Sequence, residues 1–353
     1  DLAVKAAERI PTQAELESEA ERLAERGLAG LGYRDAELER AALLTWKINR
    51  LKKEKRAVIA AHVYQRPEIL LGVADFIGDS YKLAKQGAES DAERIVFCGV
   101  RFMAETAKIL SPGKEVLLPA AEAGCSLSES MTAADVRALK KKHPKAPVAV
   151  YINTTAAVKA ECDVVVTSAN APKILRQLFA RHQKVIFAPD AMMGKNLAKD
   201  LGKTLGAELV IWDGSCMVHD NFDSASVEFY RKMYPGVKIL AHFECSPGLT
   251  SVVDYIGGTG DMMKWVAGNA AASYMLITEC GLGDLARTKF PDKIFVPMCR
   301  LCPHMKATTL ERVLSALERP TASQRIEIPA AVAARARRPI ERMFELAEDT
   351  SAS

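Results

Sequence analysis

The stretch AVIAAH (57–62) is a short apolar run that ends on a histidine, and it is followed by a second run, ADFIG (74–78), and then by Ser80. Short runs rich in aliphatic residues, alternating with helical segments, are typical of strands in parallel α/β layers. The same succession of a run, a ring side chain, a second run and a hydroxyl occurs twice more along the chain. This repetition decides the fold class.

Twelve apolar runs fall into three groups of four. The first group covers 57–62, 74–78, 94–97 and 115–119, the second 147–152, 163–168, 184–189 and 208–212, and the third 237–243, 253–258, 273–278 and 293–298. Self-similarity at this scale indicates a repeated architecture. We therefore predict three similar parallel-sheet α/β domains in a pseudo-threefold arrangement. The predicted organisation is an N-terminal helical segment (1–56), three repeats (57–130, 131–222 and 223–310) and a C-terminal helical tail (311–353).

Polar side chains stand at equivalent positions in the three groups. First runs end at His62, Tyr151 and His242, second runs end at Ser80, Ser168 and Thr259, and fourth runs lead to Cys125, Cys216 and Cys302. Parallel sheets bind ligands outside the carboxyl ends of their strands. We therefore expect three such sheets to bring these side chains into one central crevice.

Composition excludes several classes of protein. The chain has 353 residues and a net charge of +4, and this charge is too small to indicate a nucleic-acid partner. The basic run at 139–145 is typical of a solvated helix end. No apolar segment approaches the roughly 20 residues that span a bilayer. The charged, helical pattern of the first residues is not that of a secretory signal. We therefore expect a cytoplasmic protein with no membrane or nucleic-acid partner.

The eight cysteines indicate metal chemistry or packing rather than a disulfide framework, because no secretory mark accompanies them. Three thiolates from three domains suit a [4Fe–4S] cluster with one iron left open. A zinc site using Cys216 and His219 is the alternative. The remaining cysteines Cys98, Cys162, Cys245 and Cys280 are expected to be buried packing residues. Cys299, in CRLC, is either a redox partner of Cys302 or a spectator beside a ligand.

Each polar position also has a purely structural interpretation. His62 and His242 can be core histidines, and Tyr151 can be an ordinary strand aromatic. Ser80, Ser168 and Thr259 are expected to serve in part as N-caps of the following helices, and Asp190 as the cap of another. Capping is compatible with ligand binding, because a helix N-terminus with a free hydroxyl also suits carboxylate or phosphate.

The motifs resemble one family closely, the bacterial quinolinate synthases of NAD biosynthesis. The matching stretches, in the family's order over roughly residues 45–310, are AHVYQ, GDSYKLA, VRFMAETAKILSP, LLPAAEAGCSL, VAVYINTTAAVKAECDVVVTSANA, APDAMMGKNLA, WDGSCMVHDNF, AHFECSP, GGTG and MCRLCPHM. The resemblance implies three similar α/β domains around a [4Fe–4S] cluster with three cysteine ligands.

The resemblance also implies roles for individual residues. The implied cluster ligands are Cys125, Cys216 and Cys302. The implied substrate-binding residues are His62, Ser80, Tyr151, Asn153, Ser168, His242, Glu244 and Thr259, and the implied catalytic residues are Glu244, Tyr64, His242 and His219. Two positions depart from the family pattern. Phe243 stands where the family usually has proline, and Gly258 stands where serine is common.

The implied reaction is the condensation of iminoaspartate with dihydroxyacetone phosphate to give quinolinate, phosphate and water. Glu244, assisted by Tyr64 and His242, is expected to transfer protons, and an open iron is expected to act as a Lewis acid. L-Aspartate oxidase is a candidate supplier of iminoaspartate. Two other classes stay open, namely a zinc-dependent enzyme or structural zinc protein, and a non-catalytic iron–sulfur sensor.

Overall fold

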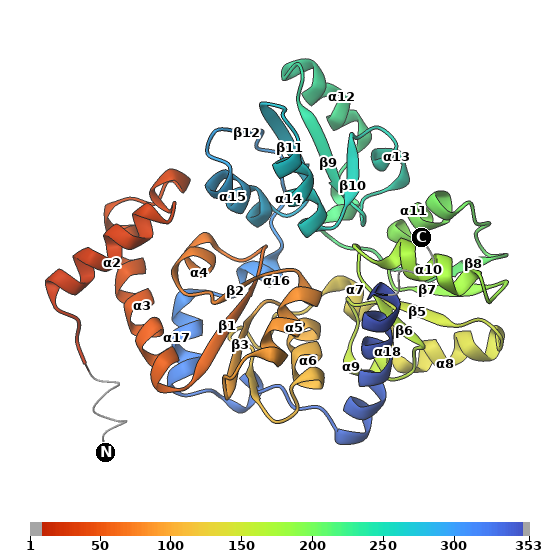
Figure 1. Ribbon diagram of the computed structural model, residues 1–353, viewed down its shortest axis with the longest axis horizontal. Coiled ribbons are helices and arrows are strands. Elements are labelled where there is room, and N and C mark those ends of the chain that lie inside the picture. The colour runs from red at the N-terminus through yellow and green to blue at the C-terminus, as the bar shows by residue number, and fades with distance from the viewer. Residues whose placement is uncertain (1–8, 349–353) are drawn as a thin grey trace. The chain divides into compact units, whose positions relative to one another are not determined.

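The computed structural model of this chain describes residues 9–348, and within them it contains three parallel sheets of four strands each (Figure 1). The strand order is the same in all three, namely β2-β1-β3-β4, β6-β5-β7-β8 and β10-β9-β11-β12. The predicted α/β fold with three similar sheets is therefore confirmed. The predicted N-terminal and C-terminal segments include residues 1–8 and 349–353, which lie outside the described residues.

All twelve predicted strands are present, and their ends differ from the predicted ones by at most three residues. Those of the first sheet are β1 (Ala57–His62), β2 (Phe76–Gly78), β3 (Arg94–Cys98) and β4 (Glu115–Leu117). Those of the second are β5 (Val148–Tyr151), β6 (Val164–Val166), β7 (Val185–Ala188) and β8 (Leu209–Ile211). Those of the third are β9 (Lys238–His242), β10 (Tyr255–Gly257), β11 (Ser273–Ile277) and β12 (Ile294–Phe295).

Backbone packing divides the described chain into two compact units. The first consists of residues 9–123, Gly281–Pro291 and Cys302–Glu327, and it holds the first sheet. The second consists of Gly124–Cys280, Asp292–Leu301 and 328–348, and it holds the second and third sheets. The domain boundaries proposed from the sequence follow the repeats rather than these units, and they stay a proposal.

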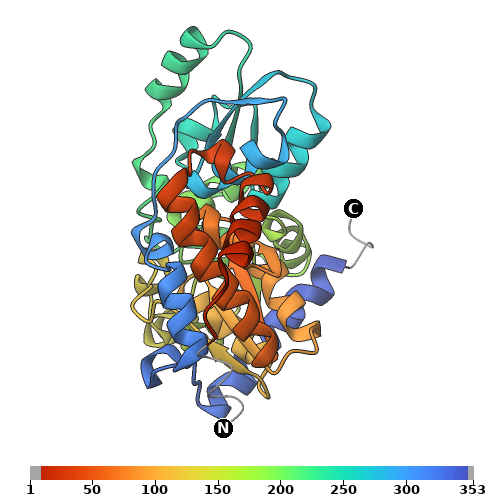
Figure 2. The ribbon, with the colours of Figure 1, turned by 90° about the vertical axis from the view of Figure 1, so that its left-hand side faces the viewer.

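Helices cover the first sheet within the first unit, where α17 lies alongside α3 (Figure 2). The elements are α2 (Gln13–Glu25), η1 (Ala29–Leu31), α3 (Asp35–Glu54), α4 (Pro67–Gly72), α5 (Ser80–Glu89), α6 (Arg101–Leu110), α16 (Pro303–Lys306), α17 (Leu310–Glu318) and η3 (Ala322–Gln324), with most of α15 (Cys280–Lys289). Aliphatic side chains of α3, β1, β3 and α17 form one buried core. Each such side chain contributes about 1.5–3 kcal/mol when fully buried.

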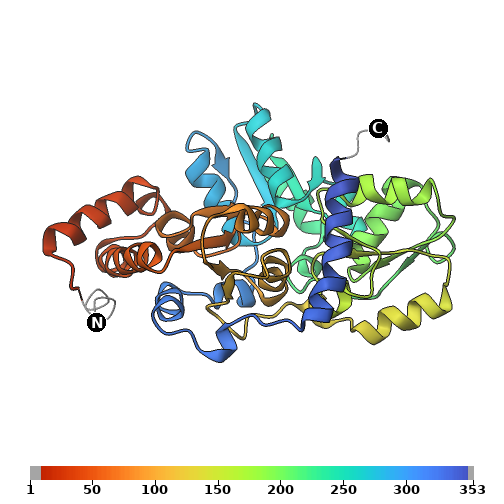
Figure 3. The same ribbon diagram turned by 60° about the horizontal axis from the view of Figure 1, so that its bottom comes forward.

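Helices also cover the two sheets of the second unit, where α18 packs against β6 and α9 (Figure 3). Its helices are α7 (Ser126–Glu129), α8 (Ala133–Lys142), α9 (Ala156–Lys159), α10 (Ala171–Phe179), α11 (Ala191–Leu201), η2 (His219–Asn221), α12 (Ser224–Met233), α13 (Pro247–Thr250), α14 (Thr259–Gly268) and α18 (Ala330–Glu348). Every residue of β5, β6 and β7 is buried, as expected for parallel strands covered on both faces. No helix among residues 9–348 is long and apolar enough to cross a membrane.

One aspartate in each repeat fastens the second strand to the first. Asp75, Asp163 and Asp254 each stand directly before the second strand of their sheet. Each carboxylate accepts a hydrogen bond from a first-strand amide, and the aspartate's own N–H donates to the carbonyl of the same residue. The partners are Ile59, Val148 and Ile239, with carboxylate contacts of 2.8, 2.8 and 2.9 Å. This shared contact was not predicted, and it supports the repeat independently of the strands.

Replacing Asp254 should measure what this contact contributes. Burial alone would raise the pKa of the Asp254 carboxyl, but the Ile239 amide and the Arg231 and Lys238 cations hold it below its ordinary value. We expect Asp254→Ala to lower the free energy of unfolding by about 1–3 kcal/mol at pH 7, as for a partly buried charged hydrogen bond. Because the folded pKa is depressed, this contribution is present above pH ~4 and disappears as the pH falls through the folded value.

Urea unfolding of the wild type and of Asp254→Ala from pH 3 to pH 7 measures the difference in their free energies of unfolding. Asp254→Asn is the matched control, because its side-chain oxygen can still accept from Ile239 and only the charge is lost. An Asp254→Ala protein as stable as the wild type at pH 7 would contradict the assignment.

Candidate functional site

The buried carboxylate of Glu244 lies at the centre of a polar cluster in the second unit. Glu244 follows β9 by two residues and is 4% exposed. Its Oε1 accepts a 2.6 Å hydrogen bond from the Tyr151 hydroxyl, at the end of β5. Its Oε2 lies 2.9 Å from Nδ1 of His219, whose Nε2 lies 2.8 Å from Oγ1 of Thr278. The second and third sheets therefore both contribute to one cluster at the carboxyl ends of their strands.

Two histidines lie beside the Glu244 carboxylate. Burial alone would raise the pKa of Glu244, but the His242 and His219 rings and the hydrogen bonds from His219 and Tyr151 hold it below its ordinary value. Burial lowers the pKa of His242 to about 4, against the opposing effect of Glu244. His242 stacks on His219 with ring centroids 4.5 Å apart. The cluster thus offers an ionised carboxylate beside a neutral imidazole at pH 7, which are two groups able to accept protons.

Two of the predicted cluster ligands lie near one another in the same unit. Ser126, the residue after Cys125, donates its hydroxyl to the carbonyl of Ser215 and accepts from the amide of Met217, both at 3.1 Å. One side chain thereby holds the backbone on both sides of Cys216. The Cys216 Sγ lies 3.2 Å from Nδ1 of His219.

These side chains fit a metal or a metal–sulfur group. Burial, followed by the negative charges of Glu244 and Cys125, raises the pKa of the Cys216 thiol well above its ordinary value. A bound cation would offset that penalty and stabilise the thiolate, which is the form that binds metals. Ligand atoms of Cys216, His219 and Glu244 also lie within 4.8 Å of one another. The same neighbourhood therefore suits the iron–sulfur interpretation and the zinc alternative.

The first unit holds the remaining predicted residues of the first repeat, together with Cys302. The amide of Tyr64 donates to Nδ1 of His62 at 3.2 Å, and the two rings meet edge to face. In the second unit the amide of Glu244 donates to Nδ1 of His242 at 3.3 Å in the same way. Tyr64 and Glu244 are therefore equivalent positions in the first and third repeats. Cys302 stands just before α16.

The hydroxyl positions of the second and third repeats are also close together. A Cβ on Gly258 would lie 2.5 Å from Oγ of Ser168, so the backbone beside Thr259 comes very near that hydroxyl. The absence of a side chain at Gly258 leaves room for this approach. Asn153 is half-buried in the loop after β5. The structure brings Tyr151, His219, His242 and Glu244 into direct contact, and the functions of all these residues stay proposals.

The expected N-caps were wrong by one or two residues. Ser80 and Thr259 are the first residues of α5 and α14, whose caps are Asp79 and Gly258, and Ser168 precedes Asn170, the cap of α10. The reason is local, because the Asp79 carboxylate already accepts from the amide of Lys82 in the first turn of α5. The Ser80 hydroxyl is therefore not used for capping. Asp190 does cap α11, as expected, through its contact with the Met193 amide.

The expectation that Cys280 is a free packing thiol was wrong. Cys280 forms a disulfide with Cys299, and their Cα atoms are 4.9 Å apart. The backbone pairing of Glu279 with Arg300 brings the two segments together. Cys98, Cys162 and Cys245 are buried free thiols, as predicted.

Sequence reasoning missed two polar residues of the cluster. Thr278, at the end of β11, fixes the far nitrogen of His219. Asn196, on α11, donates to the carbonyls of Phe243 and Cys245 on either side of Glu244. For Thr278, the available signal was its place after the third strand of the repeat. Asn196 lies within the matching stretch APDAMMGKNLA, but that stretch does not indicate its contacts, because its partners are backbone groups.

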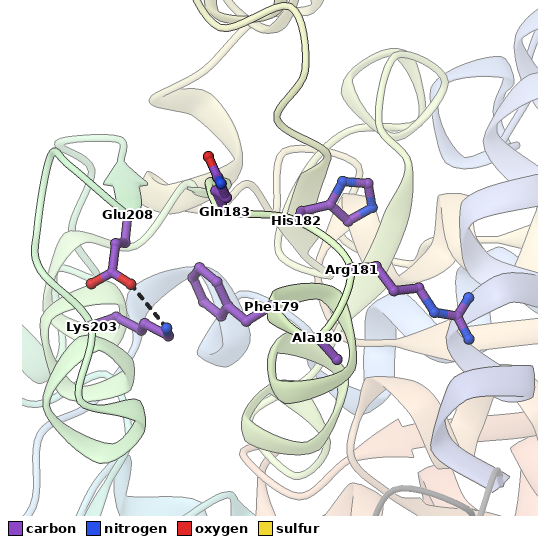
Figure 4. A pocket seen from close by; sticks show the side chains of 7 residues that line it. All are labelled: Phe179, Ala180, Arg181, His182, Gln183, Lys203 and Glu208. Atoms are coloured by element: carbon purple, nitrogen blue, oxygen red, sulfur yellow. Dashed lines mark hydrogen bonds and ion pairs between the residues drawn. The ribbon is translucent and has the colours of Figure 1, made fainter.

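A surface hollow in the second unit lies at the opposite end of the second sheet. It has a volume of about 470 Å³ and is lined by residues that precede β7 and β8, among them Arg181, His182 and Glu208. Figure 4 shows its Lys203–Glu208 ion pair, 2.9 Å long. These residues stand at the amino ends of the strands, away from the end that carries Tyr151. The hollow is therefore separate from the Glu244 cluster.

Gly214 should be essential to the loop that carries Cys216. Its backbone pairs with Pro189 and Ala191, and a Cβ there would lie 2.5 Å from both the Pro189 carbonyl oxygen and the Ser130 hydroxyl. We expect Gly214→Ala to lower the free energy of unfolding by about 1–3 kcal/mol, the usual cost of overpacking. Gly268→Ala is the control, because apart from its own helix and chain neighbours no described atom lies within 4 Å of the added methyl group. Equal melting temperatures for the two variants would show that the loop tolerates a side chain.

Comparison with known proteins identifies relatives over most of the chain. A family model described as Quinolinate synthetase A protein (NadA) matches residues 46–345. The quinolinate synthase of Sinorhizobium fredii is 44% identical over 299 residues, which cover 85% of this chain and 81% of the relative. Quinolinate synthase 1 of Mesorhizobium japonicum is 45% identical over 294 residues, covering 83% and 88%. The quinolinate synthase of Caulobacter vibrioides is 42% identical over 307 residues, covering 86% and 82%.

Proposed function

Because this chain belongs to the quinolinate synthase family, whose members are enzymes of NAD biosynthesis, we propose that it condenses iminoaspartate with dihydroxyacetone phosphate. The proposed products are quinolinate, inorganic phosphate and two molecules of water. The observation that carries this proposal is the buried Glu244 cluster at the carboxyl ends of β5 and β9. A sensor without catalysis would need no such buried set of proton-transfer groups.

The proposal assigns substrate binding to the hydroxyl and amide side chains that follow the strands. Both substrates are anionic, and hydroxyls at helix starts, like Ser80 and Thr259, are suited to carboxylate and phosphate oxygens. Ser168 lies next to Gly258 and Asn153 follows β5, so both belong to the same end of the second unit's sheets. His62 and Tyr151 complete the proposed binding set. L-Aspartate oxidase is the proposed source of iminoaspartate.

The proposal assigns the proton transfers to Glu244 and its neighbours. Joining the two carbon skeletons expels phosphate, and the keto intermediate must then isomerise, close its ring and lose two hydroxyl groups as water. Each of these stages needs a base to remove a proton or an acid to return one. Glu244 is ionised and His242 is neutral near pH 7, so both can accept a proton. Tyr64, equivalent to Glu244 in the first repeat, is the third proposed acid–base residue, and His219 orients Glu244.

The proposed cofactor is a [4Fe–4S] cluster held by Cys125, Cys216 and Cys302. Cys125 and Cys216 are neighbours within the second unit, and burial with Glu244 nearby makes a free Cys216 thiolate costly. When bound, a cluster with one iron free of cysteine supplies a Lewis acid for a hydroxyl or carboxylate oxygen. The zinc alternative rests on the Cys216–His219–Glu244 group, which would bind a single ion.

Single cysteine variants should separate these two cofactors. We expect Cys125→Ser, Cys216→Ser and Cys302→Ser each to lose the cluster, measured as iron and sulfide per chain after anaerobic purification. Cys98→Ala is the control, since Cys98 is a fully buried free thiol and alanine leaves no unpaired hydroxyl. His219→Ala should retain iron and sulfide. Loss of metal from His219→Ala with full metal in Cys125→Ser would favour a zinc site instead.

Glu244→Gln should test the catalytic assignment. Glutamine keeps the size of the side chain and can still accept from Tyr151, but it has no ionisable group. We expect quinolinate formation to fall by about 10²–10⁴-fold, the usual contribution of an acid–base residue, while iron and sulfide stay at the wild-type level. The rate is measured as quinolinate formed from freshly prepared iminoaspartate and dihydroxyacetone phosphate. A fully active Glu244→Gln enzyme would remove Glu244 from the mechanism.

A further inference from the structure

The loop after the first strand of each repeat is held by a side chain from elsewhere in the same unit. In the third repeat, Asn196 Nδ2 donates to the carbonyl of Phe243 at 2.9 Å and to that of Cys245 at 2.8 Å. These carbonyls belong to the residues immediately before and after Glu244. One amide group therefore fixes the backbone on both sides of the buried carboxylate.

The other two repeats use a lysine for the same purpose. In the second repeat, Lys159 is completely buried, and its Nζ donates to the carbonyls of Ile152 at 2.8 Å and of Thr154. Those two residues flank Asn153. In the first repeat, Lys306 Nζ donates to the carbonyl of Tyr64 at 2.6 Å. Two repeats therefore support the carbonyls on both sides of the equivalent residue, and the first repeat supports the carbonyl of that residue itself.

A second contact fixes which way the Asn196 amide points. Thr250, on α13, donates its hydroxyl to Oδ1 of Asn196 at 2.8 Å. The two carbonyl oxygens can only accept, so the NH₂ group must face them, and the Thr250 hydroxyl stabilises that orientation by donating to Oδ1. Asn196 is 6% exposed and Thr250 is 4% exposed. Because water has little access to these groups, losing one of the hydrogen bonds would leave a buried polar group unpaired.

We propose that Asn196 is a positioning residue for Glu244, oriented in turn by Thr250. The proposal rests on the proposed acid–base function of Glu244. Asn196 acts on the backbone at both sides of Glu244, whereas Tyr151 and His219 hold its carboxylate directly. Without Asn196 the two carbonyls lose buried donors and the loop shifts. The carboxylate then no longer meets its reacting atom at the right distance, while groups that bind substrate elsewhere are unaffected.

Asn196→Leu tests this proposal, because leucine has nearly the same size and no donor. We expect kcat to fall by about 10–100-fold, as for a displacement near 1 Å, with KM for both substrates changed less than about 3-fold. Iron and sulfide per chain should equal those of the wild type. An Asn196→Leu enzyme with wild-type kcat, or one whose KM rises while kcat is unchanged, would overturn the proposal.

The double variant shows whether Asn196 acts through Glu244. Effects of residues that work as one unit do not add, so Asn196→Leu should reduce the residual rate of Glu244→Gln by less than about 2-fold. A further 10-fold loss in that background would overturn the proposal. A fully active Glu244→Gln enzyme would instead refute the acid–base function on which the proposal rests, so the two failures are distinguishable.

Thr250 provides a second route if Asn196→Leu fails to fold. Thr250→Val removes the hydroxyl that orients the amide and should lower kcat about 3–10-fold with little change in KM, an intermediate loss because the Asn196 donors remain. Thr250→Ser keeps the hydroxyl and should restore most of that loss. Equal kcat values for Thr250→Val and Thr250→Ser would overturn the orientation step and with it the proposal.

Discussion

The burial of one ionised carboxylate imposes the main constraint on this protein. A charge removed from water must be compensated by donors in good geometry, because an unpaired buried carboxylate costs several kcal/mol. Glu244 obtains this compensation from Tyr151 and His219, and Thr278 in turn fixes His219. Two sheets must therefore be held in register for one side chain to stay charged. The stability of the second unit and the chemistry proposed for it are consequently linked.

In each repeat a side-chain donor binds backbone carbonyls of the loop after the first strand, but the residues involved differ. The residue two positions beyond the first strand is Tyr64, Asn153 or Glu244, while the supporting donor is Lys306, Lys159 or Asn196. The aspartates before the second strands are, by contrast, the same in all three repeats. The three repeats thus share the residue that joins their first two strands, whereas they differ in the polar residues at the carboxyl ends of the strands. Repetition supplies a common scaffold on which three different polar side chains can be presented.

The fold was predictable from the sequence because parallel strands leave a strong signal. The runs that became β5, β6 and β7 are apolar at nearly every position, since both of their faces are covered. The cap positions were missed because Ser80 and Asp79 are adjacent capping residue types and only geometry selects between them. The Cys280–Cys299 disulfide was missed because the contact depends on the pairing of Glu279 with Arg300. Sequence spacing gives no measure of that distance.

The candidate site was predictable in part, for a related reason. Tyr151 and His242 occupy strand ends, which the repeat identifies, and the family resemblance added Glu244 and His219. The structure places all four in one cluster. Asn196 was not predictable, because it binds carbonyl oxygens that every residue possesses. Asp190 was predicted only as a helix cap, yet burial followed by the charge of Glu244 raises its pKa well above the ordinary value. Such effects arise from packing between elements far apart in the chain.

The most direct test of this account is the stoichiometry of the reaction catalysed by anaerobically purified protein. Fresh iminoaspartate and dihydroxyacetone phosphate are supplied, and quinolinate and inorganic phosphate are measured in the same sample, together with iron, sulfide and zinc per chain. The account predicts quinolinate and phosphate in equal amounts from protein that contains iron and sulfide. Phosphate release without quinolinate, or quinolinate formation by protein that holds one zinc and no iron, would contradict it.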